Sequence, residues 1–195
     1  EEVEDDIVDW LLQGNAWTRY NVAKHLLACR GAELEKFSEE LRTDGSISHL
    51  AQEVSSLPWP PLTSHKSAGH PIHKLVFLSE LDVPPKELAL ESTLESILET
   101  GSSEGPFPVP MKVNKNYGGR GEVEPAWALC DAPLLLYSLT RFGYGGRSSV
   151  RKGIDHLISL SRDNGFPCAV SKSLGRFRGP GRKDDPCPYA TLAML

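Results

Sequence analysis

An internal repeat with an offset of 60 residues constrains this chain more than any other feature, and it runs without gaps from about residue 70 to residue 105. In both copies apolar side chains recur at positions i, i+4, i+7 and i+8, the spacing that places four side chains on one face of a helix. The two stripes are Leu90, Leu94, Ile97 and Leu98 in the first copy, and Val150, Ile154, Leu157 and Ile158 in the second. The repeat therefore predicts amphipathic helices at 86–100 and 148–161.

A second helix is expected before each amphipathic one. Residues 75–77 match residues 135–137 in the same register, and 134–139 is apolar almost all round, as in a helix enclosed by others. Gly and Pro (17 and 15 of the 195 residues) cluster at 57–71, 101–125 and 165–188, between one helical hairpin and the next, where they interrupt helical backbone. A partial third copy, at an offset of 57, aligns Cys130 with Cys187. Each unit is thus a helical hairpin followed by a long loop.

These hairpins predict an all-α fold with an inner and an outer layer of helices, repeated every 57–60 residues. We divide the chain into an N-terminal helical segment at 1–56, which is a divergent repeat or a cap, and hairpin repeats at 57–195 that are truncated at their C-terminus. In the first part we expect helices at 7–12, 17–29, 34–41 and 47–54. The chain begins without Met and ends inside an expected helix, so we expect it to be a piece of a longer protein.

The composition, with 39% apolar and 24% charged residues and a net charge of −5, is typical of a soluble globular domain. No apolar run approaches the ~18 residues that a membrane-spanning helix needs. The net negative charge argues against nucleic acid as a partner. The four cysteines form no CxxC pair, which favours a reducing, cytoplasmic location over a disulfide-linked secreted one.

Two segments resemble the protein prenyltransferase and terpenoid (squalene) cyclase superfamily. Residues 150–166 are similar to that family's outer helix and to the polar turn, Gly and aromatic residue that follow it, although Ser161 stands where Gln is typical. Residues 180–192 are similar to the stretch that leads into an inner helix of prenyltransferase β-subunits. The resemblance implies an α/α toroid, here an incomplete ring, with an isoprenoid-type substrate in an apolar central cavity.

The activity that the resemblance implies is that of a transferase or a cyclase. The sequence lacks both the clustered-Asp acid motif of cyclases and a DDxxD magnesium motif. An alternative therefore stays open, in which the repeats form a non-catalytic module that holds a peptide or protein on its inner surface.

Polar residues stand at matched positions where the inner helices are expected to begin, at 70–73, 130–133 and 185–188. One interpretation is structural, because Pro and Asp near a first helical turn stabilise a helix start. The other is a site at the mouth of the ring, where a helix N-terminus lowers the pKa of a thiol. On that interpretation four residues are catalytic: Asp185, Cys187, Cys130 and Asp131.

A zinc site is a second form of that hypothesis. Asp185-x-Cys187 resembles the zinc-binding pair of prenyltransferase β-subunits. The resemblance makes zinc a candidate cofactor, with His70 or His73 as the nitrogen ligand. A catalytic zinc takes three such ligands and keeps one open position.

The loops at 112–121 and 172–183 combine basic residues with glycines and aromatic rings. Arg side chains and exposed backbone N–H groups suit a diphosphate or another anion, whereas a solvated loop needs no ligand. From these loops and the adjacent helix start we predict six substrate-binding residues: Trp127, Tyr117, Arg120, Arg176, Phe177 and Arg178.

Overall fold

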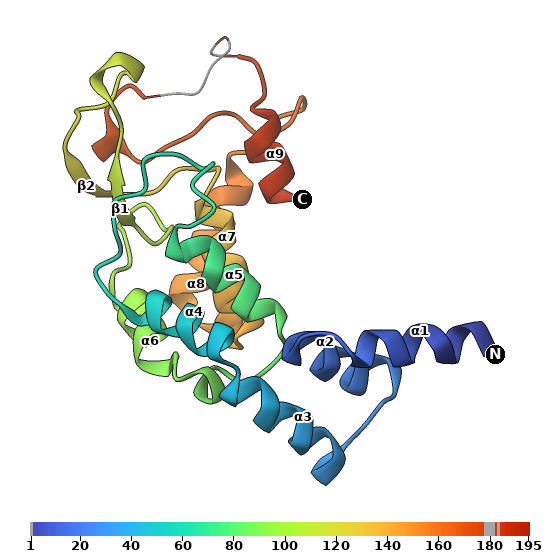
Figure 1. Ribbon diagram of the computed structural model, residues 1–195. Helices are drawn as coiled ribbons and strands as arrows, with labels where there is room; N and C mark the ends of the chain where they lie inside the picture. The colour runs from blue at the N-terminus through green and yellow to red at the C-terminus, as the bar shows by residue number, and fades with distance from the viewer. Residues whose placement is uncertain (1, 178–181, 183) are drawn as a thin grey trace. The chain divides into compact units, whose positions relative to one another are not determined.

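The computed structural model describes residues 2–177, 182 and 184–195, with residues 2–5 described by their backbone alone. Most of these residues are helical (Figure 1). None of the described helices is both long enough and apolar enough to span a membrane. Contacts divide the chain into two compact units, Glu1–Gln52 and Glu53–Leu195, and the division falls within α4 (Gly45–Ser55).

The first unit contains α1 (Glu2–Leu12), α2 (Ala16–Asn21), α3 (Gly31–Thr43) and most of α4. A continuous helix over 17–29 was expected, but α2 passes into a π-helical turn at Val22–Leu26. In this turn the N–H of Leu27 donates to the carbonyl of Val22, five residues earlier, at 3.0 Å. The wider turn ends the helix before Cys29, which is buried.

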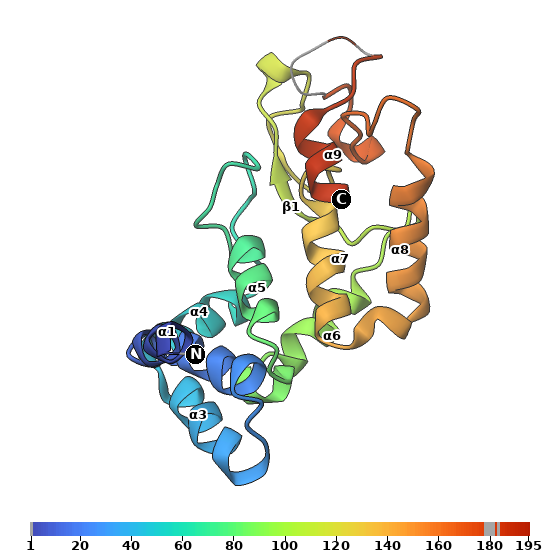
Figure 2. The ribbon, with the colours of Figure 1, turned by 90° about the vertical axis from the view of Figure 1, so that its right-hand side faces the viewer.

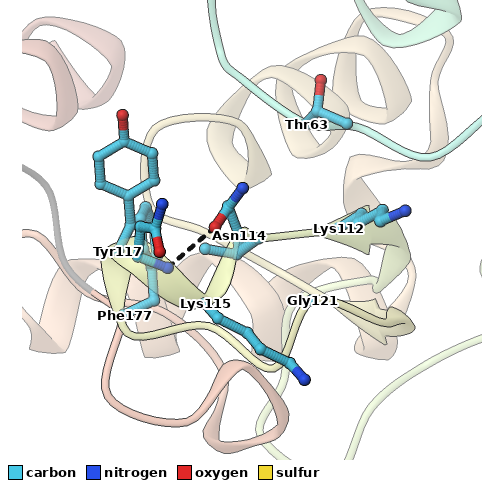
Figure 3. Close-up of a pocket in the computed structure, with 9 residues that line it drawn as sticks. Thr63, Lys112, Asn114, Lys115, Tyr117, Gly121 and Phe177 are labelled. Carbon is cyan, nitrogen blue, oxygen red and sulfur yellow. Dashed lines mark hydrogen bonds between the residues drawn. The ribbon is translucent and has the colours of Figure 1, made fainter.

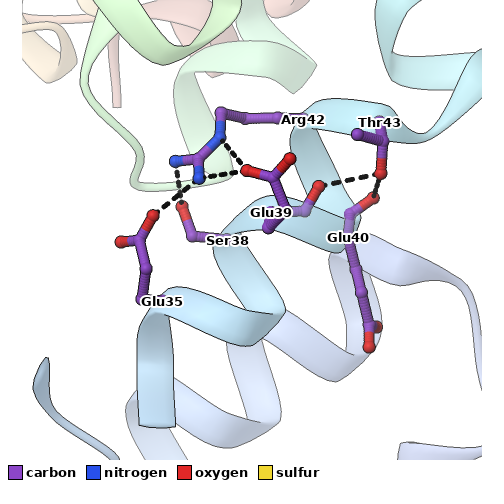
Figure 4. A network of polar contacts seen from close by, with 6 residues as sticks. All are labelled: Glu35, Ser38, Glu39, Glu40, Arg42 and Thr43. Atoms are coloured by element: carbon purple, nitrogen blue, oxygen red, sulfur yellow. Dashed lines mark hydrogen bonds and ion pairs between the residues drawn. The ribbon is translucent and has the colours of Figure 1, made fainter. Parts of the chain in front are cut away.

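A network of charged side chains covers one face of α3 (Figure 4). The guanidinium of Arg42 forms ion pairs with Glu35, at 2.6 Å, and with Glu39. It also donates to the hydroxyl of Ser38 at 3.2 Å. These partners precede Arg42 by three, four and seven residues, so they lie on its own side of the helix.

After the end of α4, the described part of the second unit contains five α-helices: α5 (Pro71–Glu80), α6 (Glu91–Glu99), α7 (Ala132–Arg141), α8 (Ser148–Ser159) and α9 (Pro188–Met194). α7 packs against α5 on one side and α8 on another, and α9 also contacts α7 (Figure 2). The core between them is built mainly of leucines that are almost wholly buried: Leu75, Leu78, Leu135, Leu136 and Leu139.

The two predicted apolar stripes are largely buried, although Leu98 and Ile154 are only half-buried and the second stripe ends at an exposed residue. Leu90, Leu94, Val150 and Leu157 are 0–1% exposed, but Ile158 is 56% exposed. The inward face of α8 includes Gly153, where an added Cβ would stand 2.9 Å from the side chain of Leu136. Because α8 lies close to α7 on that face, Ile158 points outward.

The expected loop at 101–125 contains a β-hairpin, so the all-α prediction was incomplete. β1 (Val109–Lys112) and β2 (Val123–Ala126) pair antiparallel, with Val109 opposite Ala126. Val109 and Met111 are buried while their neighbours along β1 are not, which is the alternation of a half-buried strand.

A segment before α5 pairs with the other edge of β1. The N–H of Leu62 donates to the carbonyl of Pro110 at 2.8 Å, and the N–H of Lys112 donates to the carbonyl of Leu62 at 3.0 Å. Leu62 is 1% exposed. The hairpin is therefore fixed to the helical unit by backbone hydrogen bonds as well as by packing.

Candidate functional site

Three helices of the second unit begin at the matched polar residues. His70, Asp131 and Cys187 are the N-cap residues of α5, α7 and α9, and each helix has a Pro in its first turn. Nδ1 of His70 accepts the N–H of Ile72 at 3.2 Å, and Sγ of Cys187 accepts the N–H of Ala190 at 3.5 Å. The structural interpretation thus holds for His70 and Cys187, which satisfy N–H groups that a helix start leaves unpaired, whereas the side chain of Asp131 makes no capping hydrogen bond.

His70 uses both of its ring nitrogens. Nε2 lies 2.9 Å from the carbonyl oxygen of Pro60, and since a carbonyl only accepts, Nε2 carries the proton and Nδ1 is the acceptor. Burial lowers the pKa of His70, against the opposing effect of its hydrogen bond to Pro60. The neutral ring that results has no free lone pair for zinc in this conformation.

Asp131 is a buried carboxyl with one unpaired oxygen. The residue is 2% exposed, its Oδ2 accepts the thiol proton of Cys130 at 3.1 Å, and its Oδ1 is buried without a hydrogen-bond partner. Burial raises the pKa of Asp131, while the thiol and three nearby histidines, His65, His73 and His70, lower it. A carboxyl in this setting holds its proton at pH values where an exposed Asp is ionised.

Cys130 is a thiol rather than a thiolate. Burial raises its pKa, and the negative charge of Asp131 raises it further. The expectation that a helix start would lower this pKa was wrong for Cys130, because desolvation and the neighbouring carboxylate outweigh the helix N-terminus. Its thiol serves as a hydrogen-bond donor to Asp131.

A groove of about 470 Å³ lies between α5, α7 and α9, and Cys130 stands at its wall. Pro133, Leu134 and Tyr137 line it from one face of α7. The other lining residues are Val76 and Glu80 from α5, and Tyr189, Leu192 and Ala193 from α9. We refer to this space as the helix groove.

Sequence reasoning missed two polar residues here: Tyr189, which lines the groove, and His65, which stacks on Tyr189. The rings of His65 and Tyr189 stack at a tilt, with centroids 4.1 Å apart, and burial raises the pKa of Tyr189, with Asp131 adding to the effect. His73 has a buried Nε2 without a hydrogen-bond partner. His73, the alternative nitrogen ligand in the zinc hypothesis, lies one helical turn after His70 on the same side of α5.

Asp185 belongs to no metal-binding cluster of side chains in the described part of the chain. It is exposed, and its Oδ2 accepts the N–H of Arg182 at 2.8 Å, within its own loop. Among the residues that the structure describes, no group of three or more His, Cys, Asp or Glu side chains is placed to hold a metal ion. Zinc held by Asp185, Cys187 and His70 therefore stays a hypothesis from the sequence alone.

A second cavity, of about 670 Å³, opens beside the β-hairpin (Figure 3). Two predicted substrate-binding residues, Tyr117 and Phe177, line it. Its other lining residues are Thr63, Lys112, Val113, Asn114, Lys115, Asn116 and Gly121. We refer to this space as the hairpin pocket.

The remaining predicted binding residues are placed differently. Arg120 pairs with Glu124 at 3.4 Å and does not line the hairpin pocket, and Arg176 is exposed beside the pocket. Trp127 is 4% exposed, and its indole N–H donates to Glu104 at 2.8 Å. Trp127 therefore fixes one loop to another rather than facing a ligand. Arg178 lies outside the described residues.

Comparisons with known proteins do not identify a function for either cavity. No protein-family model, curated protein or solved structure matches the chain. The function is therefore argued from the two cavities and the groups around them.

Proposed function

We propose that the Glu53–Leu195 unit is a prenyltransferase- and terpenoid-cyclase-like domain that binds an isoprenoid-type molecule in the helix groove. One observation carries the proposal: a groove walled mostly by apolar side chains adjoins a half-buried thiol, Cys130, and a buried carboxyl, Asp131. Small-molecule sites commonly combine apolar walls with a few convergent polar groups.

The packing of the helices supports an α/α toroid arrangement. α5, α7 and α9 are alternate helices of the unit, and α7 contacts both of the others. α8 packs on a different part of α7, where Gly153 meets Leu136. In our proposal α5, α7 and α9 form the inner layer, and α6 and α8 form the outer layer of the curved array.

The walls of the helix groove suit a branched hydrocarbon chain. Leu134 and Tyr137 are one turn apart on α7, and Leu192 faces them from α9. Leu192 is 70% exposed without a ligand, so covering it removes apolar surface from water. Burying a leucine side chain contributes roughly 1.5–3 kcal/mol.

In this proposal Asp131 is the acid of the site. Its raised pKa keeps a proton available, and the Cys130 thiol stabilises the carboxylate that remains when that proton leaves. An acid beside an apolar groove is suited to protonating a group that lacks strong basicity, because little water competes for the proton.

Binding of farnesol, measured by isothermal titration calorimetry, tests the proposal. Leu192→Asp places a charge in the groove at an exposed position, and Leu195→Asp is the matched control because Leu195 is 98% exposed and outside the groove lining. We expect Leu192→Asp to weaken farnesol binding at least tenfold and Leu195→Asp to leave it unchanged. Absence of farnesol binding to the unsubstituted protein would overturn the proposal.

A specific observation also favours the second candidate, a module that holds a peptide. Tyr137 and Leu192 expose 44% and 70% of their surfaces at the groove, as the rim of a peptide-binding groove does. Mass spectrometry of the purified protein separates the two candidates. A co-purified isoprenoid supports the first candidate, and a retained peptide supports the second.

A further inference from the structure

The hairpin pocket has a charge opposite to that of the whole chain. The protein carries a net charge of −5, yet both charged side chains in the pocket lining, Lys112 and Lys115, are cationic. Neither forms an ion pair in the described part of the chain. Two uncompensated ammonium groups at one concave surface attract an anion.

The uncharged polar groups of the pocket add donors to these cations. Oδ1 of Asn114 accepts the N–H of Asn116 at 2.9 Å, which leaves the amide Nδ2 of Asn114 as a donor toward the open side (Figure 3). Thr63 supplies a hydroxyl at the same surface. A ligand group rich in acceptor oxygens, such as a phosphate, matches this set.

Two aromatic rings complete the lining. Tyr117 is 69% exposed, and Phe177 reaches the pocket from a different loop. An exposed aromatic ring offers a face on which a planar group can stack.

The pocket walls are held in place by close backbone packing. A Cβ at Gly118 would stand 3.0 Å from the carbonyl oxygen of Arg176, and one at Gly119 would overlap the carbonyl oxygen of Val113 at 2.4 Å. Gly118 also has a φ of 82°, which favours glycine. The hairpin loop and the loop at 175–177 therefore form one surface before any ligand arrives, which lowers the entropic cost of binding.

We infer that the hairpin pocket binds a small molecule that carries a phosphate group and a planar ring, with Lys112 and Lys115 holding the phosphate and Tyr117 stacking on the ring. The hairpin pocket shares no lining residue with the helix groove. This inference is therefore independent of the function proposed above. A nucleic acid is disfavoured because the whole chain carries a net charge of −5.

Adenosine monophosphate, adenosine and inorganic phosphate serve as probes for the full chain, with binding followed by calorimetry and by ¹H–¹⁵N NMR shifts. We expect adenosine monophosphate to bind at least tenfold more tightly than either fragment. The double variant Lys112→Gln/Lys115→Gln should weaken its binding at least tenfold and leave the weak binding of adenosine unchanged. Tyr117→Leu should weaken both.

Lys86→Gln is the matched control, because Lys86 is exposed and lies outside the pocket. All three lysines are exposed, so these variants are expected to keep the fold, which the NMR spectra report directly. Failure of adenosine monophosphate to bind would overturn the inference. So would binding that is unchanged in the double variant, or weakened equally by Lys86→Gln.

Discussion

Gly105 and Gly165 occupy matched positions of the repeat and share one backbone conformation, with φ of 115° in both. An L side chain rarely adopts this φ, so the repeat places glycine where the chain must leave a helical hairpin and enter a long loop. A Cβ at Gly105 would also stand 3.0 Å from the carbonyl oxygen of Lys152, on α8.

Gly105→Ala should therefore destabilise the second unit by about 1–3 kcal/mol, because a strained φ and a backbone contact act together. Gly146→Ala is the control, since Gly146 has open space around its Cβ position and no positive φ. Urea denaturation measures both. If the two variants had equal urea midpoints of unfolding, the conformation at Gly105 would not require glycine.

Asp131→Asn should change how stability depends on pH. The folded pKa of Asp131 is raised, so the folded state binds its proton more tightly than the unfolded state. The stabilising contribution is complete below about pH 4, the ordinary Asp value, and is lost as the pH rises through the raised pKa. The Asn variant lacks this loss, so its stability relative to the parent should increase between acid and neutral pH.

The size of that change is about 1.4 kcal/mol for each pH unit that separates the folded and unfolded pKa values. Denaturation curves collected from pH 3 to pH 8 measure it. Parallel pH profiles for the two proteins would contradict the burial of an ionisable carboxyl at this position.

His70→Ala should cost about 1–3 kcal/mol, because it removes the cap of α5 and leaves the carbonyl of Pro60 without its donor. His70→Asn keeps an acceptor for the helix N-terminus and should recover part of that loss. Thermal unfolding compares the two. If the Asn variant were no more stable than the Ala variant, the cap would contribute little.

Arg42→Ala should destabilise the first unit by about 0.5–1 kcal/mol, because its ion pairs with Glu35 and Glu39 are partly exposed to water. Lys36→Ala, at an exposed position of the same helix, is the control and should be nearly neutral. The difference between the variants should shrink in 1 M salt, where surface charges are screened. A salt-independent difference would assign the effect to packing.

The helical hairpins and the starts of α5, α7 and α9 could be predicted because they depend on local patterns. An apolar stripe at helical spacing needs only the neighbouring turns, and a Pro after a capping residue acts on one helix end. The offset of 60 also aligns Gly105 with Gly165, and the structure gives both a φ of 115°.

Other features depend on residues that are distant in the sequence. β1 and β2 were hidden in a Gly- and Pro-rich window, and Leu62 pairs with β1 across some fifty residues of chain. The raised pKa of Cys130 likewise comes from burial and from Asp131, which no spacing rule conveys. The basic loop at 112–121 was expected to suit an anion, but the sequence did not indicate that Thr63 and Phe177 would line the same pocket, because only the fold brings these segments together.

The residues at three N-cap positions differ in kind: an imidazole, a carboxyl and a thiol stand at the start of α5, α7 and α9. A helix start accepts any of several side chains there, so a duplicated hairpin is free to exchange one for another while its backbone stays the same. The positions that keep such helices intact are thus also those where successive copies can diverge in chemistry. A protein assembled in this manner can acquire new reactivity without acquiring a new architecture.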